Sequence, residues 1–263
     1  MSRNLKVYCI GHTLPLFKPS VPFEMLCPSS LGIRNEVVID DHRFGPTVDG
    51  SSLAEYSQLF GLHDKLLSGD IVADELYLFQ YRKFLSPMYG GLESVSPWIR
   101  VLTPEIVSGI FPSEEHLVTF RTRLAVGSLF GLGNSISGNY ALVHVIDDLV
   151  MFSAACAASG FLTPKDISSL ATLRGIIPSP AVCYINAELF VRIMDILKSV
   201  WNNYYPHYQI VRTGYQRRVA GYLMERLHSL LLCKWLMDNS EPDIRVWHRY
   251  VVTDLTQAPV LAP

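Results

Sequence analysis

The stretch ELYLFQYRKFLSP, residues 75–87, decides the fold, because it joins the most strand-like run of the chain to its densest group of hydrogen-bond donors. Four consecutive apolar residues, 76–79, are typical of a buried strand. The run stops at Gln80, and the cationic tripeptide Tyr81-Arg82-Lys83 follows at once. We therefore expect a strand over 75–80 whose carboxyl end carries two cations and a phenol.

Outward from this strand, short apolar runs alternate with amphipathic segments. The further strands that we expect are 7–10, 37–39, 182–185 and 246–252, the last at a sheet edge. The expected helices are 53–68, a short one from 104, 139–160, a short one from 164, 186–201 and 215–237. Ser52 and Glu55 have the spacing of a capping box for the first of these helices. The alternation predicts an α/β protein with a mixed sheet and helices on both faces.

Composition limits the partners and the compartment. The 263 residues form one predicted domain, 1–263, with a helical C-terminal subregion at about 186–240. A net charge of −2 with no basic excess argues against a nucleic-acid partner. The five cysteines are odd in number and include no CxxC pair, which favours a reducing, cytoplasmic location. The sequence has no uninterrupted run of ~18 apolar residues, so we expect no membrane-spanning helix.

Polar residues follow several of the expected strands. His12 comes after the first, Asp40 and Asp41 after the second, and Asn186 after a later one. Ligands of such sheets bind outside the carboxyl ends of the strands, so we expect these residues to line a site with Tyr81-Arg82-Lys83. Arginine and lysine suit phosphate oxygens. The alternative for the cations is a strand that simply runs into solvent.

Two later helices carry candidate acid–base groups. His144 and Asp148 are four residues apart, a spacing that lets them share a proton or hold a metal, although a polar stripe facing water explains them more simply. Glu225 and Arg226 lie in an otherwise apolar helix, and buried charges need partners. We expect Glu225 to be held by Arg82 or Lys83, and a surface ion pair is the alternative.

The standard catalytic motifs are missing from the sequence. There is no GxSxG, HExxH or Walker sequence, and the GLG at 131–133 lacks a preceding expected strand, so it is no dinucleotide fingerprint. An Asp-x-Asp at a strand end is also missing, so a divalent metal, Mg or Mn, has no motif behind it.

Four segments in order resemble a glycosyltransferase-like family of bacterial capsule, exopolysaccharide and lipopolysaccharide loci. They are LFQYRKFL, similar to a His-Tyr-Arg-Arg motif, then YALVHVIDDL, AVCYINAELF and GYLMERLHSLLL, the last similar to Gly-Phe-Leu-x-Glu-Arg-Leu. The resemblance covers about residues 5–237. In this chain Gln80 stands where the motif has His, and Lys83 stands where it has the second Arg.

The resemblance implies a GT-A-like, Rossmann-type mixed sheet that binds a nucleotide sugar, with a UDP-sugar as the expected donor and a glycan or lipid-linked acceptor. From their positions in these motifs, the expected site residues are Tyr81, Arg82, His144, Asp148, Glu225 and Arg226. We expect either no cofactor or a divalent metal, Mg or Mn, whose place two cations near the phosphates could take. Contact of the helix 215–237 with a membrane surface is an alternative to its place in the core, which is the simpler explanation.

These assignments give a mechanistic hypothesis. Arg82 and Lys83 neutralise the leaving diphosphate, and Glu225 holds one of them. His12, or a carboxylate such as Asp148 or Asp41, deprotonates the acceptor. The rings of Tyr81 and Tyr184 stack on the base or the sugar. Because Gln80 cannot act as a base, the main alternative is a sugar-nucleotide-binding or partner protein that has lost turnover; a hydrolase built on the same sheet is another.

Overall fold

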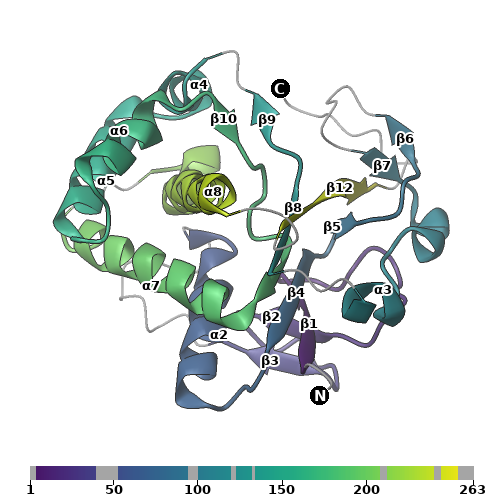
Figure 1. The fold of residues 1–263 in the computed structure, drawn as a ribbon. Coiled ribbons are helices and arrows are strands. Elements are labelled where there is room, and N and C mark those ends of the chain that lie inside the picture. Colours follow the sequence, from purple (N-terminus) through teal and green to yellow (C-terminus); the bar gives the residue numbers. More distant parts are fainter. Residues whose placement is uncertain are drawn as a thin grey trace.

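A mixed β-sheet runs through the protein, whose computed structural model describes residues 4–39, 53–93, 100–119, 123–131, 134–207, 212–239 and 244–253. Within these ranges the main sheet has ten strands, ordered β3-β2-β1-β4-β11-β8-β12-β7-β6, with β5 beside β4 and β12 (Figure 1). Their bounds are β1 Leu5–Ile10, β2 Glu24–Cys27, β3 Glu36–Val38, β4 Glu75–Gln80, β5 Lys83–Ser86, β6 Leu92–Glu93, β7 Arg100–Leu102, β8 Leu124–Gly127, β11 Cys183–Asn186 and β12 Ile244–Val252. A separate pair consists of β9 Phe130–Gly131 and β10 Gly175–Ile176.

The strand directions bring only some of the strand ends together. β1 is parallel to both β2 and β4, with Ile10 opposite Gln80. In contrast, β11 is antiparallel to β4 and to β8, and Asn186 is the register partner of Glu75. The carboxyl end of β11 therefore lies at one end of the strands, and the carboxyl ends of β1 and β4 lie at the other.

β5 closes part of the sheet on itself. It pairs with β4 through Gln80 and Lys83, and then with β12 along its length. The strands β4, β11, β8, β12 and β5 thus form a closed ring, a small barrel, and not the fully open sheet of the Rossmann-type expectation. The Tyr77 hydroxyl fastens the ring, since it donates to the backbone oxygen of Leu85 at 2.6 Å in the buried interior.

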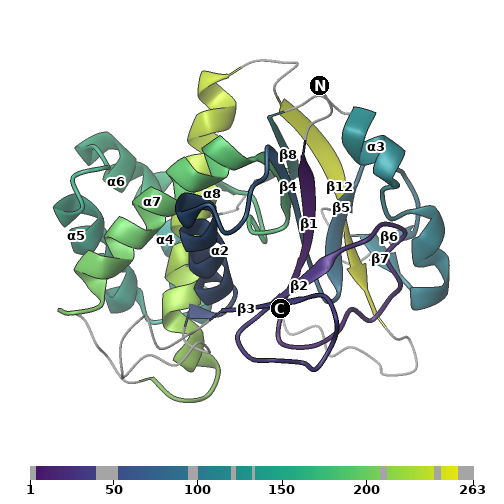
Figure 2. The ribbon, with the colours of Figure 1, turned by 90° about the horizontal axis from the view of Figure 1, so that it is seen from below.

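The helices lie mostly on one face of the sheet (Figure 2). This layer contains α2 Tyr56–Ser68, α4 Ile136–Val143, α5 Ile146–Ala158, α6 Pro164–Thr172, α7 Ala187–Tyr204 and α8 Val219–Asp238. The opposite face carries the short α3, Glu114–Thr119, and a 3₁₀ helix, Pro104–Gly109. Alternation along β4 matches the two layers, because Leu76 and Leu78 join the core under the helices and Tyr77 and Phe79 join the other core.

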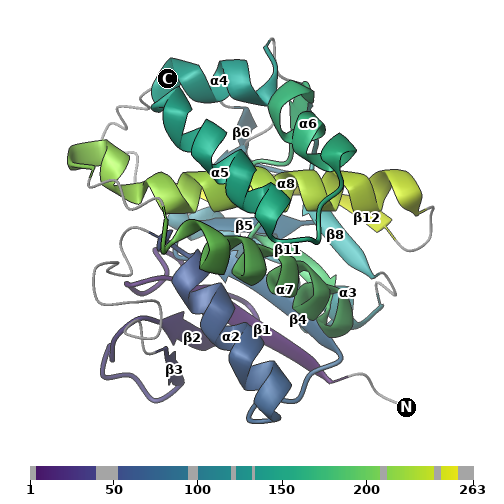
Figure 3. The ribbon, with the colours of Figure 1, turned by 90° about the vertical axis from the view of Figure 1, so that its left-hand side faces the viewer.

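α8 occupies the middle of the helical layer and crosses the sheet between α5 and α7 (Figure 3). Side chains around most of its circumference are buried, from Val219 to Cys233. This confirms that the apolar helix expected at 215–237 belongs to the core, although its first turn, Gly214–Arg218, is 3₁₀. Among the described helices, none combines the length and the apolar content that crossing a membrane requires.

Two expectations about elements are corrected. The helix expected over 139–160 is two helices, broken between Val143 and Ile146. The strand at 246–252 is not at an edge, because β12 pairs with β8, β5 and β7. The structure also contains a strand that the sequence did not predict, β5, which begins at Lys83 directly after the turn residues Tyr81 and Arg82.

Candidate functional site

The β4–β5 turn separates the cations that the sequence places side by side. Gln80 and Lys83 are register partners across the turn, and partners in an antiparallel pair point to the same face. Both side chains reach the helical layer, while Tyr81 and Arg82 form the turn itself. The Arg82 side chain is exposed, with its guanidinium carbon 5.5 Å from the ring centre of Tyr81. Lys83, and not Arg82, is therefore the cation that enters the interior.

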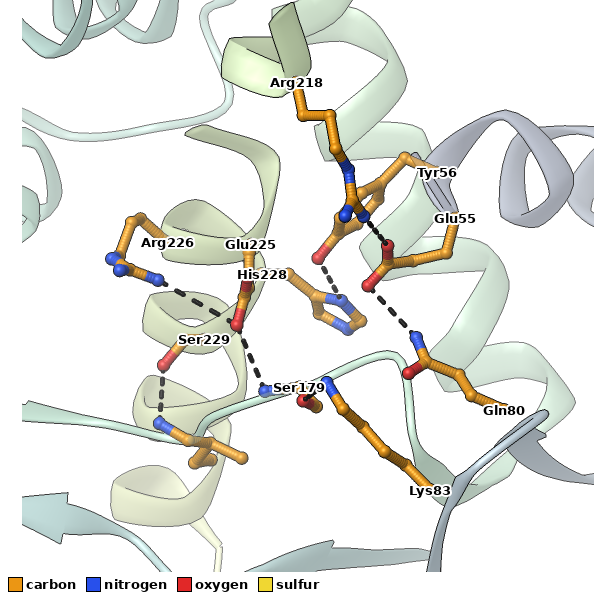
Figure 4. Close-up of polar contacts among 11 residues, drawn as sticks. Glu55, Tyr56, Gln80, Lys83, Ser179, Arg218, Glu225, Arg226, His228 and Ser229 are labelled. Carbon is orange, nitrogen blue, oxygen red and sulfur yellow. Dashed lines mark hydrogen bonds and ion pairs between the residues drawn. The ribbon is translucent and has the colours of Figure 1, made fainter. Parts of the chain in front are cut away.

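Lys83 is linked to Glu225 through Ser179 (Figure 4). The Lys83 Nζ donates to Ser179 Oγ at 3.1 Å, and the Ser179 backbone nitrogen donates to Glu225 Oε1 at 3.2 Å. Burial lowers the pKa of Lys83, whereas the negative charges of Glu225 and Glu55 oppose that shift. The partner expected for Glu225 is thus Lys83, engaged through a serine that the sequence gave no reason to select.

Glu55 is a second carboxylate of this cluster. It immediately precedes α2, accepts a hydrogen bond from Gln80 Nε2 at 3.2 Å and lies 3.8 Å from Arg218 Nη2. Its side chain does not cap the helix, and Ser52 lies outside the described residues. Burial raises the pKa of Glu55, and repulsion by Glu225 adds to the increase. A carboxyl group with a raised pKa at such an edge is a candidate acid–base group.

Backbone geometry around the cluster is unusual. Ala54 and Ser179 have φ of +51° and +49°, and within the described residues no other non-glycine residue has a positive φ. Such conformations are sparsely populated and concentrate at functional sites. Gly221 allows α8 to pack closely against the backbone at Leu53 and Ala54. A Cβ added at Gly221 would lie 3.1 Å from the Leu53 backbone oxygen and 3.0 Å from the Ala54 Cβ.

α8 also holds the two segments that carry Glu55 and Ser179. The Tyr56 hydroxyl lies 3.3 Å from His228 Nδ1, and Ser229 Oγ accepts from the backbone nitrogen of Ile177 at 2.7 Å (Figure 4). Burial lowers the pKa of His228 to about 3, so this ring is neutral at physiological pH. His228 is therefore a support for the cluster rather than a proton carrier.

His12 lies next to the β4–β5 turn, as expected from the parallel pairing of β1 and β4. Its ring centre is 6.0 Å from that of Tyr81, and its side chain is exposed. The two residues form an aromatic rim beside Arg82. Asp40 and Asp41, which were expected at the same edge, lie outside the described residues.

His144 and Asp148 lie near one another but take separate partners. His144 ends α4, its Nδ1 is 3.2 Å from Gln216 Oε1, and its ring stacks on Tyr222 at 4.2 Å between centres. The buried Asp148 accepts from Arg212 Nη2 at 2.8 Å. Burial lowers the pKa of His144. The structure records no hydrogen bond between them, and the break between α4 and α5 removes the i, i+4 relation.

Of three further predicted residues, Asn186 and Tyr184 lie away from the cluster, whereas Arg226 forms an ion pair with Glu225 of the cluster. Asn186 caps α7, where its Oδ1 accepts from the backbone nitrogens of Glu188 and Leu189, at the opposite edge of the sheet. Tyr184 is buried in the core on the other face, 6.0 Å from Trp247 between ring centres. The antiparallel direction of β11 accounts for the place of Asn186, and the register of Tyr184 with Tyr77 turns its side chain into the core on the other face. Arg226 is buried, and its Nη1 is 3.9 Å from Glu225 Oε1.

Sequence reasoning missed Glu55 as a site residue and missed Ser179 altogether. Glu55 has the spacing of an ordinary helix-capping residue, which conceals its other role. Ser179 stands between two prolines, Pro178 and Pro180, a pattern that signals an irregular loop but not its contacts.

Among the described residues, no three His, Cys, Asp or Glu side chains come close enough together to hold a metal ion. A groove of about 610 Å³ lies at the far end of the sheet, between β1, β3 and the residues after α2, and includes Lys6 and Lys65. We assign the candidate site to the Lys83 cluster because the carboxyl ends of parallel strands meet there, and the groove lies beside the amino end of β1.

Comparison with known proteins gives one structural likeness. No protein-family model matches the chain, and no curated protein matches it. A solved structure described as the apo form of WbbM, a bifunctional glycosyltransferase, superposes with a TM-score of 0.73 at 17% sequence identity, over 95% of this chain and 46% of that one. This chain thus spans about half the length of that protein. The likeness shows that the protein has a mixed α/β fold similar to that of a glycosyltransferase.

Proposed function

We propose that the protein is a glycosyltransferase that moves a sugar from a nucleotide-sugar donor to a glycan acceptor. The observation that carries the proposal is the cluster of Lys83, Glu55 and Glu225 at the carboxyl ends of β1 and β4, where α/β sheets bind ligands. The fold likeness to a bifunctional glycosyltransferase over 95% of the chain supports the same class.

Lys83 is the residue that we assign to the donor diphosphate. Among the described residues its ammonium group makes one hydrogen bond, to Ser179 Oγ, and an ammonium group has three N–H donors. Negative charge develops on the diphosphate as the sugar leaves, and a fixed cation stabilises that charge more in the transition state than in the ground state. Glu225 holds Ser179 in place and is thereby a positioning residue.

Glu55 is the candidate general base. The reaction needs a group that accepts the proton of the acceptor hydroxyl, and a carboxylate with a raised pKa is better matched to that task than an ordinary one. Gln80 Nε2 and Arg218 fix its two oxygens. His12, on the aromatic rim, is the alternative base. Asp148 and His144 are occupied by Arg212 and Gln216, so we assign them to the support of the helical layer.

The finer identity follows the resemblance of the sequence motifs. We propose a UDP-sugar donor and a surface-polysaccharide or lipid-linked acceptor of the capsule or lipopolysaccharide type. The five cysteines are unpaired and buried, in keeping with a reducing, cytoplasmic location. Near Lys83 the described residues include no group of three His, Cys, Asp or Glu side chains that could hold Mg or Mn.

A sugar-nucleotide-binding protein without turnover is the second candidate, and Gln80 is the observation that favours it. Gln80 stands where the similar family has histidine, and its amide cannot take a proton at neutral pH. In this structure, however, its Nε2 orients a carboxylate that can, which favours an active enzyme.

A panel of nucleotide sugars tests the proposal. A true donor at 100 times its dissociation constant stabilises the fold by about 2.7 kcal/mol, and we expect one member of the panel to raise the melting temperature and to be hydrolysed slowly without acceptor. Binding without hydrolysis or transfer, with every candidate acceptor, would favour the second candidate. Stabilisation by no nucleotide sugar would contradict both.

A further inference from the structure

Arg249 is a buried cation for which the described part of the chain supplies no hydrogen-bond partner. It lies on β12 with 2% of its surface exposed, and its Nε, Nη1 and Nη2 make no hydrogen bond to any residue that the structure describes. A buried guanidinium without partners is expensive, because its lost hydration is not replaced. A protein that keeps such a group gains from it elsewhere, and a bound anion is the direct way to satisfy all three nitrogens.

Gly127 of β8 makes room for this side chain. β12 and β8 are parallel neighbours with Trp247 opposite Gly127. A Cβ added at Gly127 would lie 2.1 Å from Arg249 Nη2 and 2.5 Å from Cζ, far inside contact distance. Glycine inside a strand weakens the strand unless something must approach closely. Here the guanidinium is that group, so the strand is shaped around Arg249.

The position of Arg249 connects it to the Lys83 cluster. Its positive charge contributes to the lowered pKa of Lys83, and the negative charge of Glu225 acts on Arg249. Burial lowers the pKa of Arg249 to about 10, while Glu225 opposes the shift, so the side chain remains a cation at neutral pH. The structure records no hydrogen bond between Glu225 and Arg249; Glu225 Oε1 accepts from the backbone nitrogen of Ser179 and lies 3.9 Å from Arg226 Nη1.

Side-chain exposure differs widely among the charged residues of this region. Arg218 has a side chain that is 52% exposed, Glu225 one that is 25% exposed, and Arg249 is only 2% exposed. Arg249 is therefore the most buried of the three charges.

We propose that Arg249 binds a phosphate group of the donor diphosphate together with Lys83. This rests on the proposed function. The planar fork of a guanidinium matches two phosphate oxygens, and Lys83 supplies a second positive charge. Bound phosphate would provide the partners that Arg249 lacks and would draw Lys83 and Arg249, which repel each other, onto one anion.

Binding measurements with three probes test this assignment. We would measure the affinities of uridine diphosphate, uridine and inorganic pyrophosphate by titration calorimetry for the wild type, Arg249→Met and Arg249→Lys. Arg245→Met is the matched control, because it removes an arginine from the same strand. We expect Arg249→Met to weaken the binding of both phosphate-containing probes about 10- to 100-fold, the value of a hydrogen bond to a charged group, without changing uridine binding. Arg249→Lys should weaken them less, and Arg245→Met should match the wild type.

The measurements give different results if the assignment of Arg249 is wrong and if the proposed function is wrong. If the wild type binds uridine diphosphate and Arg249→Met binds it equally well, the role of Arg249 is wrong and the proposed function stands. If the wild type binds pyrophosphate through Arg249 but no nucleotide, the anion site stands and the proposed function fails. If it binds neither, both fail.

A second measurement covers the case in which Arg249→Met does not fold. The guanidinium ¹⁵N resonance of Arg249, assigned by its loss in Arg249→Lys, should shift when pyrophosphate is added to the wild type. A resonance that does not respond at saturating pyrophosphate would overturn the inference.

Discussion

Gln80 and Lys83 face each other across the β4–β5 turn, yet each fixes a different distant segment: Gln80 holds Glu55 at the start of α2, and Lys83 holds Ser179 before β11. The turn therefore joins a carboxylate with a raised pKa to a buried ammonium group. In the proposed reaction Glu55 takes the proton of the acceptor hydroxyl, and Lys83 stabilises the negative charge of the leaving group. One tight turn therefore positions the groups that act on both substrates.

Replacing Lys83 should reduce turnover far more than replacing Arg82. We expect Lys83→Met to lower kcat/KM about 10²- to 10³-fold, the usual loss for one preorganised stabiliser of developing charge. Arg82→Met removes an equal charge from the exposed turn and should cost much less, since exposed charges are screened by water. Steady-state kinetics on the two variants checks this, and a larger loss for Arg82→Met would contradict the assignment of Lys83.

Glu55→Gln should stabilise the fold and abolish most of the activity. Because the pKa of Glu55 is raised in the folded protein, the carboxyl contributes stability below its unfolded pKa, about 4.3, that is lost as pH rises through the folded value. The uncharged amide escapes this loss, so the variant should melt higher than the wild type at pH 8 and not at pH 4.

The same substitution tests the catalytic role of Glu55. We expect turnover to fall about 10²- to 10⁴-fold, the typical contribution of a general base, and the wild-type kcat/KM to rise with pH through the raised pKa. A Glu55→Gln enzyme that kept wild-type turnover and its pH profile would move the base to another residue, with His12 next in order.

Gly221→Ala should disturb the site through the backbone. Alanine favours a helix interior by about 1 kcal/mol, but its Cβ would press on the Leu53 backbone oxygen 3.1 Å away. We expect a net loss of stability of about 1–3 kcal/mol, as for other overpacked positions, with lower activity because Glu55 shifts. Gly109→Ala is the control, since nothing lies within 4 Å of an added Cβ there. Equal melting temperatures for the two variants would show that the close approach is unimportant.

His228 should make stability depend on pH in a defined window. Its folded pKa is lowered to about 3, so between about pH 6.5 and pH 3 the unfolded chain binds a proton that the folded chain does not. Stability contributed by the neutral ring is therefore complete above pH 6.5 and is lost as pH falls, by up to about 1.4 kcal/mol per pH unit. His228→Asn keeps an acceptor for Tyr56 and removes this titration. Denaturant unfolding of both proteins from pH 7 to pH 4 should show a shallower pH dependence for the variant, and parallel curves would mean that His228 is protonated in the folded state.

Local patterns predicted much of the fold. Four sequence features indicate elements close to their observed bounds. They are the apolar run 76–79 for β4, Gly69 after the expected helix 53–68 for α2, Thr163 before the helix expected from 164 for α6, and Asn186 at the start of the helix expected over 186–201 for α7. These elements are determined by residues that are close together in the sequence, so their bounds could be predicted from the sequence.

Strand direction could not be obtained in the same way. Whether β11 runs parallel or antiparallel to β4 depends on pairing between residues about 110 apart, such as Asn186 and Glu75. The direction places Asn186 at the far end of the sheet, and the register with Tyr77 places Tyr184 on the other face. The break at His144 and the contacts of Ser179 likewise depend on tertiary packing, so the sequence identified Lys83 and Glu225 but neither the serine between them nor Glu55.

The most direct test of the central claim is a structure of the protein with a nucleoside diphosphate bound. The account predicts that a phosphate oxygen lies within hydrogen-bond distance, about 3 Å, of Lys83 Nζ, with Glu55 facing the space where the sugar would sit. A diphosphate found instead in the groove beside Lys6 and Lys65, with Lys83 still bound only to Ser179, would contradict it.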